Sequence, residues 1–428
     1  MNSASRFRSF VFGVFLSASI ATSAYPCPFC YSVSTWTLSE QVAEHDVVAL
    51  VQWHHAVRGV GAKPGTTTFE VLEVLRAPQP GAPPKGHLID FVTYREDNDP
   101  TVRAFSQNKG HLIDFVTYRE GKAGDLFLLC GKNANTFIWY HPFKISNAAY
   151  DYVKRAPSPQ MPIPQRLEYF LNYLEHADPQ IAEDAYAEFA DVSYQELIAF
   201  APKIPREKVH SWVADPNIDS KRLGLYGKLL GLVGNDDDAE MMAKLIAQPS
   251  DDYRPGIDGV MAGYLLLTGE AGLELIEKTK LLDKTVPFET YAAMQALRFM
   301  WQHGQGRISQ DRLRESMRIL LDHLEFTDLV IGDLARWKDW ESQERLAALY
   351  GEGEYNTPPI KRAIARFMLV SMCDVPKTAN DVGTTEADRP EHAVRGEKLL
   401  EEIRLKDPKP VSQVEQIFYF PKLRRPVN

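Results

Sequence analysis

The chain has 428 residues, of which 44% are hydrophobic and 25% are charged, and its formal net charge is −9 at pH 7. This composition is that of a globular protein of two or three domains, and it excludes wholesale disorder, a collagen-like repeat and a polytopic membrane protein. The excess of acidic residues argues against nucleic acid as a partner. Four cysteines are too few for a disulfide-stapled fold, and a chain of this length can bury a core without them.

Residues 1–24 are predicted to be a signal peptide for export to the periplasm or the medium. Arg6 and Arg8 precede a short apolar run at residues 10–20, and small residues then lead to a cleavage site after Ala24. The run is about half the roughly 20 residues that a membrane-spanning helix needs. No second apolar run of spanning length occurs, so we predict no membrane span. Loss of the two arginines takes the net charge from −9 to −11.

Residues 25–155 are predicted to form a β-domain. Short β-branched or alternating stretches, separated by Gly and Pro, are typical of strands. Several short strands with little helix between them indicate a small barrel or sandwich. The expected strands lie at residues 47–51, 66–75, 126–130 and 136–140.

A sequence of twelve residues occurs twice in this region. Residues 85–96 recur unchanged as residues 109–120, 24 positions later. Two copies cannot fill the same place in a closed barrel, so we expect one copy to form a strand and the other an added hairpin or loop. A functional repeat array would have more units and some divergence. The identity is typical of a recent duplication, or of an assembly error in the sequence.

The composition changes after a proline-rich stretch, residues 156–164, which is predicted to be a semi-rigid linker. Residues 165–428 carry apolar residues at helical spacing, for example Leu223, Tyr226 and Leu230. This pattern predicts an all-α remainder.

The predicted helices follow a repeat of roughly 35–40 residues, which is typical of an α-solenoid of four to six units. Ala-Asp-Pro at residues 177–179 returns at residues 214–216, and Asp before Pro suits a helix start because Asp caps the first free amides. Further helix starts are expected near Pro249, Pro287 and Pro358. The alternative is a helical domain without repeats.

The chain resembles known families in two places. Cys27-Pro28-Phe29-Cys30, a helical segment at residues 34–45 and strands at residues 46–51 and 68–75 look like the start of a netrin-like or metalloproteinase-inhibitor-like domain. Residues 229–238 resemble the turn between the helices of HEAT-like repeats.

The combination is similar to uncharacterised exported bacterial proteins that begin with Cys-Pro-Phe-Cys. It implies an α+β chain of two domains, in which a small OB-like, netrin-like barrel precedes an all-α HEAT-like solenoid. In the netrin-like family, disulfides tie the cysteine-bearing N-terminus to later strands.

Cys27 and Cys30 form the single motif suited to reaction chemistry. A redox pair of the thioredoxin kind follows a strand, and a structural zinc site needs a second cysteine pair; neither condition is met, since Cys130 and Cys373 are isolated. Outside the cytoplasm a structural disulfide is the favoured interpretation. We expect Cys130, at the end of a strand, to pair with Cys27 or Cys30, and Cys373 to be a buried thiol. Redox activity and metal binding stay open.

Other motifs favour structural roles. The acidic run after Asn235 lacks the spacing of a calcium-binding EF-hand and suits a helix start. Adjacent His54 and His55 on a strand would point to opposite faces, which argues against a shared metal site with His45. Hydrolase, metalloprotease and phosphate-loop patterns are absent from the sequence. We therefore predict no catalytic residue, no cofactor and no bound metal.

The sequence favours a non-enzymatic exported binding or scaffold protein whose partner is a protein, because solenoids present long surfaces. Trp212, Trp301, Trp337 and Trp340 are candidate exposed anchors for such a partner.

Two alternatives remain at this stage. One is a thiol–disulfide redox protein that uses Cys27 and Cys30. The other is protease inhibition by the β-domain, whose zinc-chelating form is disfavoured by a mature terminus at Tyr25 instead of a cysteine.

Overall fold

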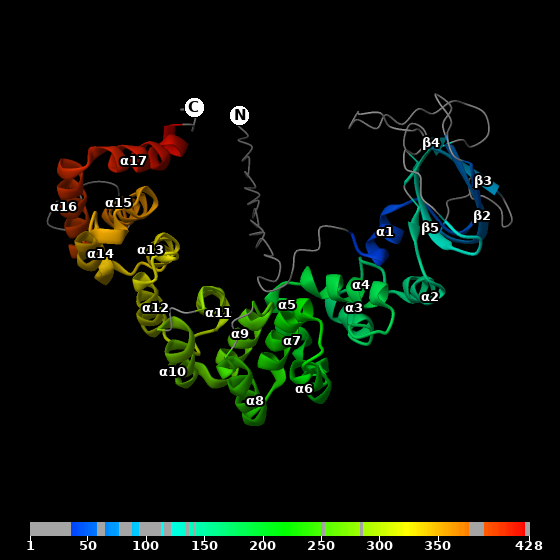
Figure 1. Ribbon diagram of the computed structural model, residues 1–428, viewed down its shortest axis with the longest axis horizontal. Helices are drawn as coiled ribbons and strands as arrows, with labels where there is room; N and C mark the ends of the chain where they lie inside the picture. Colours follow the sequence, from blue (N-terminus) through cyan, green and yellow to red (C-terminus); the bar gives the residue numbers. More distant parts are fainter. Residues whose placement is uncertain are drawn as a thin grey trace, which may run out of the picture.

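A β-sheet formed by the first third of the chain leads into a long curved row of helices (Figure 1). The computed structural model describes residues 36–57, 65–76, 88–93, 113–114, 121–133, 137–140, 142–249, 253–282, 286–375 and 389–423. The expected α+β class, with strands first and a helix-rich remainder, is confirmed. The proposed signal peptide, Cys27 and Cys30 lie outside the described residues.

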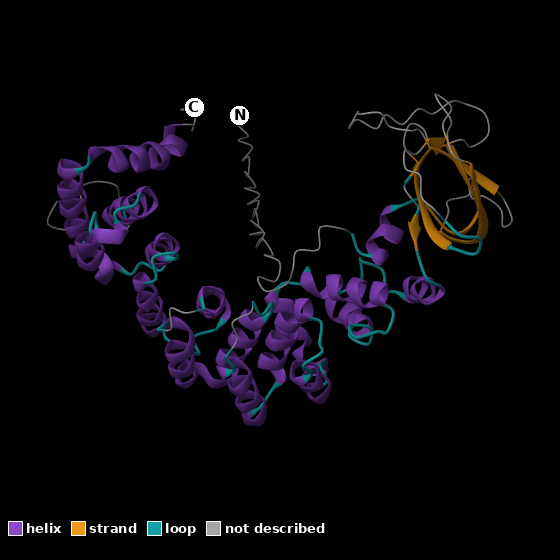
Figure 2. Ribbon diagram, in the orientation of Figure 1, coloured by secondary structure: helices purple, strands orange, loops and turns teal. Residues whose placement is uncertain are grey.

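The sheet has seven strands in the order β4-β3-β2-β1-β5-β6, with β7 paired to β5, and it is strongly curved (Figure 2). Its pairs are antiparallel except for β3 with β4. All four expected strands are present. The strands are β1 (Val47–Val57), β2 (Gly65–Arg76), β3 (Leu88–Thr93), β4 (Ile113–Asp114), β5 (Leu126–Asn133), β6 (Phe137–Trp139) and β7 (Phe143–Lys144).

The two faces of the sheet are both buried, but against different partners. Alternate residues of a strand point to opposite faces. Val48, Leu50 and Leu128 belong to the core that continues into the helices, whereas Val51 and Phe127 belong to a separate small cluster on the other face. Burial on both faces explains why residues 47–51 form an unbroken apolar run.

The two copies of the duplicated sequence have different places in the sheet. The first copy supplies β3, which pairs with β2 along its length. In the second copy, Ile113 and Asp114 form β4 at the edge of the sheet, parallel to Phe91 and Val92 of β3. An edge position tolerates an added segment because no further strand has to pair with it.

The helical part begins with a short helix before the sheet, α1 (Leu38–Glu44), and continues after β7. The helices after β7 are α2 (Asn147–Arg155), α3 (Ile163–Phe170), α4 (Pro179–Ala190), α5 (Tyr194–Phe200), α6 (Arg206–Ala214), α7 (Ser220–Val233), α8 (Asp236–Ala247), α9 (Ile257–Thr268), α10 (Leu273–Ile276), α11 (Pro287–His303), α12 (Gln310–Ile319), α13 (Thr327–Arg336), α14 (Gln343–Leu349), α15 (Pro358–Met372), α16 (Glu391–Lys406) and α17 (Pro408–Leu423). On the curve of Figure 1, α11, α13 and α15 lie on the inner side and α10, α12 and α16 on the outer side.

Three of the five expected helix starts are confirmed. Pro179, capped by Asp178, begins α4, and Pro287 and Pro358 begin α11 and α15. The other two are wrong. Asp215 instead follows the end of α6, where its side chain accepts a hydrogen bond from the backbone of Asn217 (2.8 Å) and forms a turn. Proline 249 lies beyond the end of α8.

The proline-rich stretch does not separate two independent cores. It joins α2 to α3, and the Tyr169 hydroxyl of α3 donates a hydrogen bond to the carbonyl of Tyr152 in α2 (2.7 Å). The rings of these two tyrosines stack with centroids 5.6 Å apart. Tyr152 and Leu128 belong to the same hydrophobic cluster, so the sheet and the first helices share one core.

One helical run among the described residues, Ile257–Leu281, is long and apolar enough to cross a membrane by length and composition. Most of its apolar window, 61%, is buried inside the protein. Its first helix, α9, packs closely on α7: a Cβ atom at Gly259 would lie 2.1 Å from the carbonyl oxygen of Gly224. This burial is typical of a core helix.

Several ion pairs of the helical part join elements that are 32–36 residues apart in the sequence, while others span 21–23 or 46–47 residues. The carboxylates of Asp238, Glu289 and Asp333 are buried, and each pairs with an arginine that is 18–27% exposed. The separations are 32 residues for Arg206 with Asp238, 35 for Arg254 with Glu289, 35 for Arg298 with Asp333, 35 for Arg312 with Glu277 and 36 for Lys338 with Asp374.

These pairs predict a large loss of stability when a buried partner is removed. Asp333→Ala should lower the free energy of unfolding by about 3 kcal/mol, because it leaves the Arg298 guanidinium without its buried carboxylate. Asp311→Ala is the matched control: Asp311 is 87% exposed and pairs with Arg314 on the surface, so its loss should cost at most about 1 kcal/mol. Urea denaturation of both variants measures the difference, and equal losses would contradict this role of burial.

Candidate functional site

Of the three cysteines predicted to form a site, the structure describes Cys130 but not Cys27 or Cys30. Cys130 lies in β5, is 3% exposed and forms no disulfide with another described residue, and burial raises the pKa of its thiol to about 12. A thiol with this pKa is protonated at neutral pH and is a poor nucleophile. A disulfide from Cys130 to Cys27 or Cys30 stays a prediction, because both partners lie outside the described residues.

Cys373 differs from its expected environment. It was expected to be buried, but it is exposed, because it is the C-cap residue of α15 and stands at the end of the helix instead of on its packed face.

The two environments predict different reactivities. Iodoacetamide should modify Cys373 in the native protein and leave Cys130 unmodified, since the Cys130 thiol is buried and protonated. After denaturation without a reductant, iodoacetamide should modify Cys130 if it is a free thiol and should leave it unmodified if it is in a disulfide. Peptide mass spectrometry reads both steps, and native modification of Cys130 would contradict its burial.

The alternation of side chains along a strand predicts that His54 and His55 point to opposite faces of β1. The structure shows that this prediction is wrong. Trp53 pairs with Phe69 and His55 pairs with Thr68, so His54 is the extra residue of a β-bulge. The bulge brings Nδ1 of His54 to 2.9 Å from Nδ1 of His55, and both side chains are exposed. Within the described parts of the chain, no three His, Cys, Asp or Glu side chains converge in a way that would hold a metal ion.

The acidic run after Asn235 begins a helix, as expected. Asn235 is the N-cap of α8 and forms a capping box with Asp238. Burial alone would raise the pKa of Asp238, but hydrogen bonds from Arg206, the Asn235 backbone and His210 outweigh burial and lower it. These contacts occupy the carboxylate oxygens and give Asp238 a structural role.

The four candidate tryptophans are not exposed anchors. Trp212, Trp337 and Trp340 are at most 9% exposed. Trp301 stacks on Trp337 with ring centroids 4.4 Å apart, and the Arg314 guanidinium covers its ring. The prediction that these four residues are exposed anchors is therefore wrong, because neighbouring side chains cover them.

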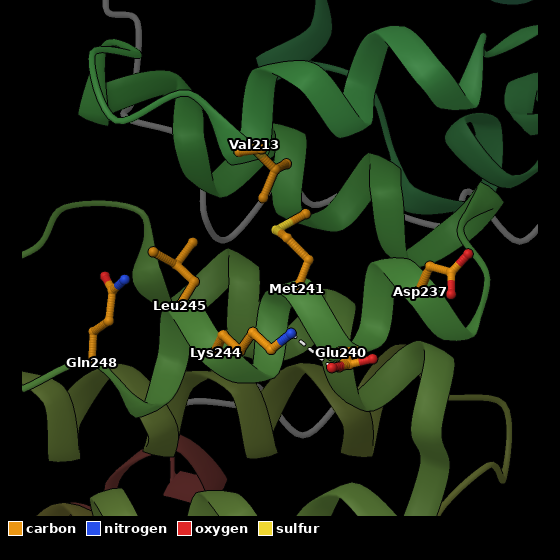
Figure 3. A pocket seen from close by; sticks show the side chains of 8 residues that line it. Val213, Asp237, Glu240, Met241, Lys244, Leu245 and Gln248 are labelled. Carbon is orange, nitrogen blue, oxygen red and sulfur yellow. Dashed lines mark ion pairs between the residues drawn. The ribbon is translucent and has the colours of Figure 1, made fainter.

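A shallow hollow of about 320 Å³ lies between α6 and α8 (Figure 3). Glu240 and Lys244 line it and pair with each other at 2.7 Å, and both are about 70% exposed. Because these charges satisfy one another in water, the hollow offers little to orient a ligand.

A larger groove of about 710 Å³ lies among α13, α15 and α17. We call it the arginine groove. Three arginines and one aspartate stand among its apolar side chains. Its lining residues are Asp328, Ile331, Gly332, Ala335, Arg336, Arg362, Ala363, Arg366, Phe367, Val370, Val414, Ile417 and Phe418. The volume is in the range of ligand-binding clefts.

The sequence analysis does not predict this groove. Its three walls come from helices that begin at residues 327, 358 and 408, and only the tertiary structure brings them together. The local sign was the pair Arg362 and Arg366, one helical turn apart beside the apolar residues of α15.

A cluster of polar side chains joins α1 to the helical part. The backbone N–H of Leu38 and the hydroxyl of Tyr152 donate hydrogen bonds to the two carboxylate oxygens of Asp184, at 2.7 and 2.8 Å. Ser39 donates to the buried Glu188, one turn further along α4, at 2.5 Å. Burial raises the pKa of Asp184 to about 7 despite these hydrogen bonds.

The raised pKa of Asp184 predicts that stability falls as pH rises. An unfolded aspartate has a pKa near 4, so the folded state retains a proton that the unfolded state releases. The contribution is present in full below about pH 4 and is lost as the pH rises through about 7. Asp184→Asn should therefore reduce the difference in unfolding free energy between about pH 5 and about pH 8.

The matched control for this measurement is Asp151→Asn, which changes an exposed side chain of α2. Its pH dependence should equal that of the unaltered protein. A pH dependence that Asp184→Asn leaves unchanged would show that Asp184 does not titrate in this range.

No family model, curated protein or solved structure that was compared with the chain matches it. Among the described residues, the arginine groove combines volume, apolar lining and unsatisfied charge, whereas the hollow of Figure 3 has its charges paired.

Proposed function

We propose that the protein is a non-enzymatic exported scaffold that binds a protein partner through its helical part. The observation that carries this proposal is the arginine groove, a cleft of about 710 Å³ lined by α13, α15 and α17, of which α13 and α15 lie on the inner side of the curved row of helices (Figure 1). Concave surfaces of stacked helices are suited to extended protein partners.

The finer fold assignment is part of the same proposal. We infer that residues 25–155 form a netrin-like OB barrel and residues 165–428 a HEAT-like solenoid. Support for the solenoid comes from four ion pairs at separations of 35 or 36 residues, within the repeat of roughly 35–40 residues expected from the sequence. Support for the barrel comes from the curvature of the sheet and its own small core.

The test is capture of partners from the exported fraction of the source organism, with the mature chain and its Cys27→Ser/Cys30→Ser variant as immobilised baits. A scaffold should retain the same protein on both baits, and high salt should release it without a reductant. A blank resin is the control.

Two outcomes would contradict the scaffold. One is that neither bait retains a protein beyond the blank resin. The other is that the unaltered bait alone retains a protein and only a reductant releases it, which would favour thiol–disulfide chemistry at Cys27 and Cys30.

A further inference from the structure

We propose that the arginine groove binds an acidic amphipathic helix of the partner protein. This inference rests on the proposed scaffold function and names the chemistry of the segment that the scaffold recognises. It follows from the apolar stripes, the charges and the openness of the groove.

Each of the three helices turns an apolar stripe toward the groove. Ala363, Phe367 and Val370 follow one another at i, i+4 and i+7 on α15, which forms the floor because it contacts both α13 and α17. On α17, Val414 and Ile417 lie one turn apart, and Ile417 is 70% exposed. An amphipathic helix laid in such a groove packs its own apolar face against these stripes.

The charges of the groove favour an acidic occupant. Arg362 and Arg366 line it, and their guanidinium groups form no ion pair or hydrogen bond with the described residues. Arg336 pairs with Asp333, a carboxylate that Arg298 also binds. Three arginines against the single aspartate of the lining make a basic patch on a chain whose net charge is −9. Opposite charge on a partner directs it to this patch, and guanidinium groups bind carboxylates in a bidentate manner.

The shape of the groove favours a helix over a small molecule or a membrane. Ile417 and Arg366 are exposed, so a small ligand would stay largely in water, whereas small-molecule sites enclose most of their ligand. Two of the lining helices, α13 and α15, lie on the concave inner side of the curved row (Figure 1), a side that a flat bilayer does not follow.

Gly332 provides a way to fill the groove without disturbing the core. A Cβ atom at this position would have only the Nη1 atom of Arg336 nearby, at 3.8 Å. Gly332→Trp should therefore block the groove in a folded protein. Gly332→Ala, which adds one methyl group at the same place, is the matched control.

The test uses fluorescent helical peptides of about 16 residues, long enough to be partly helical alone. One carries leucines at i, i+3, i+4 and i+7 with glutamates on both flanks, the second has lysines in place of the glutamates, and the third is a scramble of the first. Fluorescence anisotropy with the full mature chain should show that the glutamate peptide binds at least about tenfold more tightly than the other two.

The variants should locate this binding. Arg362→Glu/Arg366→Glu should weaken the glutamate peptide about tenfold or more and strengthen the lysine peptide. Gly332→Trp should weaken the glutamate peptide, and Gly332→Ala should leave its affinity unchanged. Far-ultraviolet circular dichroism checks that each variant is folded.

The proposal is overturned if the three peptides bind alike or if the variants bind the glutamate peptide like the unaltered chain. Oleate or anionic vesicles that bind with the same dependence on the variants would make the occupant a lipid. A dimer in sedimentation velocity that Gly332→Trp abolishes would make it a second copy of the chain. A partner captured equally by unaltered and Gly332→Trp baits would leave the scaffold function standing and refute the groove as its site.

Discussion

Buried carboxylates that pair with arginines from other elements determine how the helical part is assembled. A buried charge is costly unless a partner compensates it, so Asp238, Glu289 and Asp333 each require an arginine from another part of the chain at a defined place. The arginines keep part of their surface in water, which reduces the cost of the pair. Apolar stripes alone allow helices to slide or rotate by a turn, whereas a pair of this kind is satisfied in one arrangement.

The arginines of the helical part occur in two different environments. Arg206, Arg254 and Arg298 face buried carboxylates of the chain itself and are satisfied. Arg362 and Arg366 stand at the edge of an apolar groove without such a carboxylate among the described residues. A guanidinium that no internal acid satisfies is available to an external one.

The sheet and the helices depend on each other at their junction. One face of the sheet belongs to the core that continues into the helices. On the other side of the junction, Asp184 and Glu188 of α4 accept hydrogen bonds from Leu38 and Ser39 and hold α1 against the helical part.

The sequence by itself determined the elements whose causes are local. The apolar run at residues 47–51, the capped proline of α4 and the acidic start of α8 follow from strand burial and capping within a few residues. Only the tertiary structure decided the features that depend on distant partners. A register shift against Phe69 and Thr68 turned His54 and His55 to the same side, and the end of α15 left Cys373 exposed. The arginine groove belongs to this second class, because its walls are far apart in the chain, and only the packed structure shows that Arg362 and Arg366 have no carboxylate partner among the described residues.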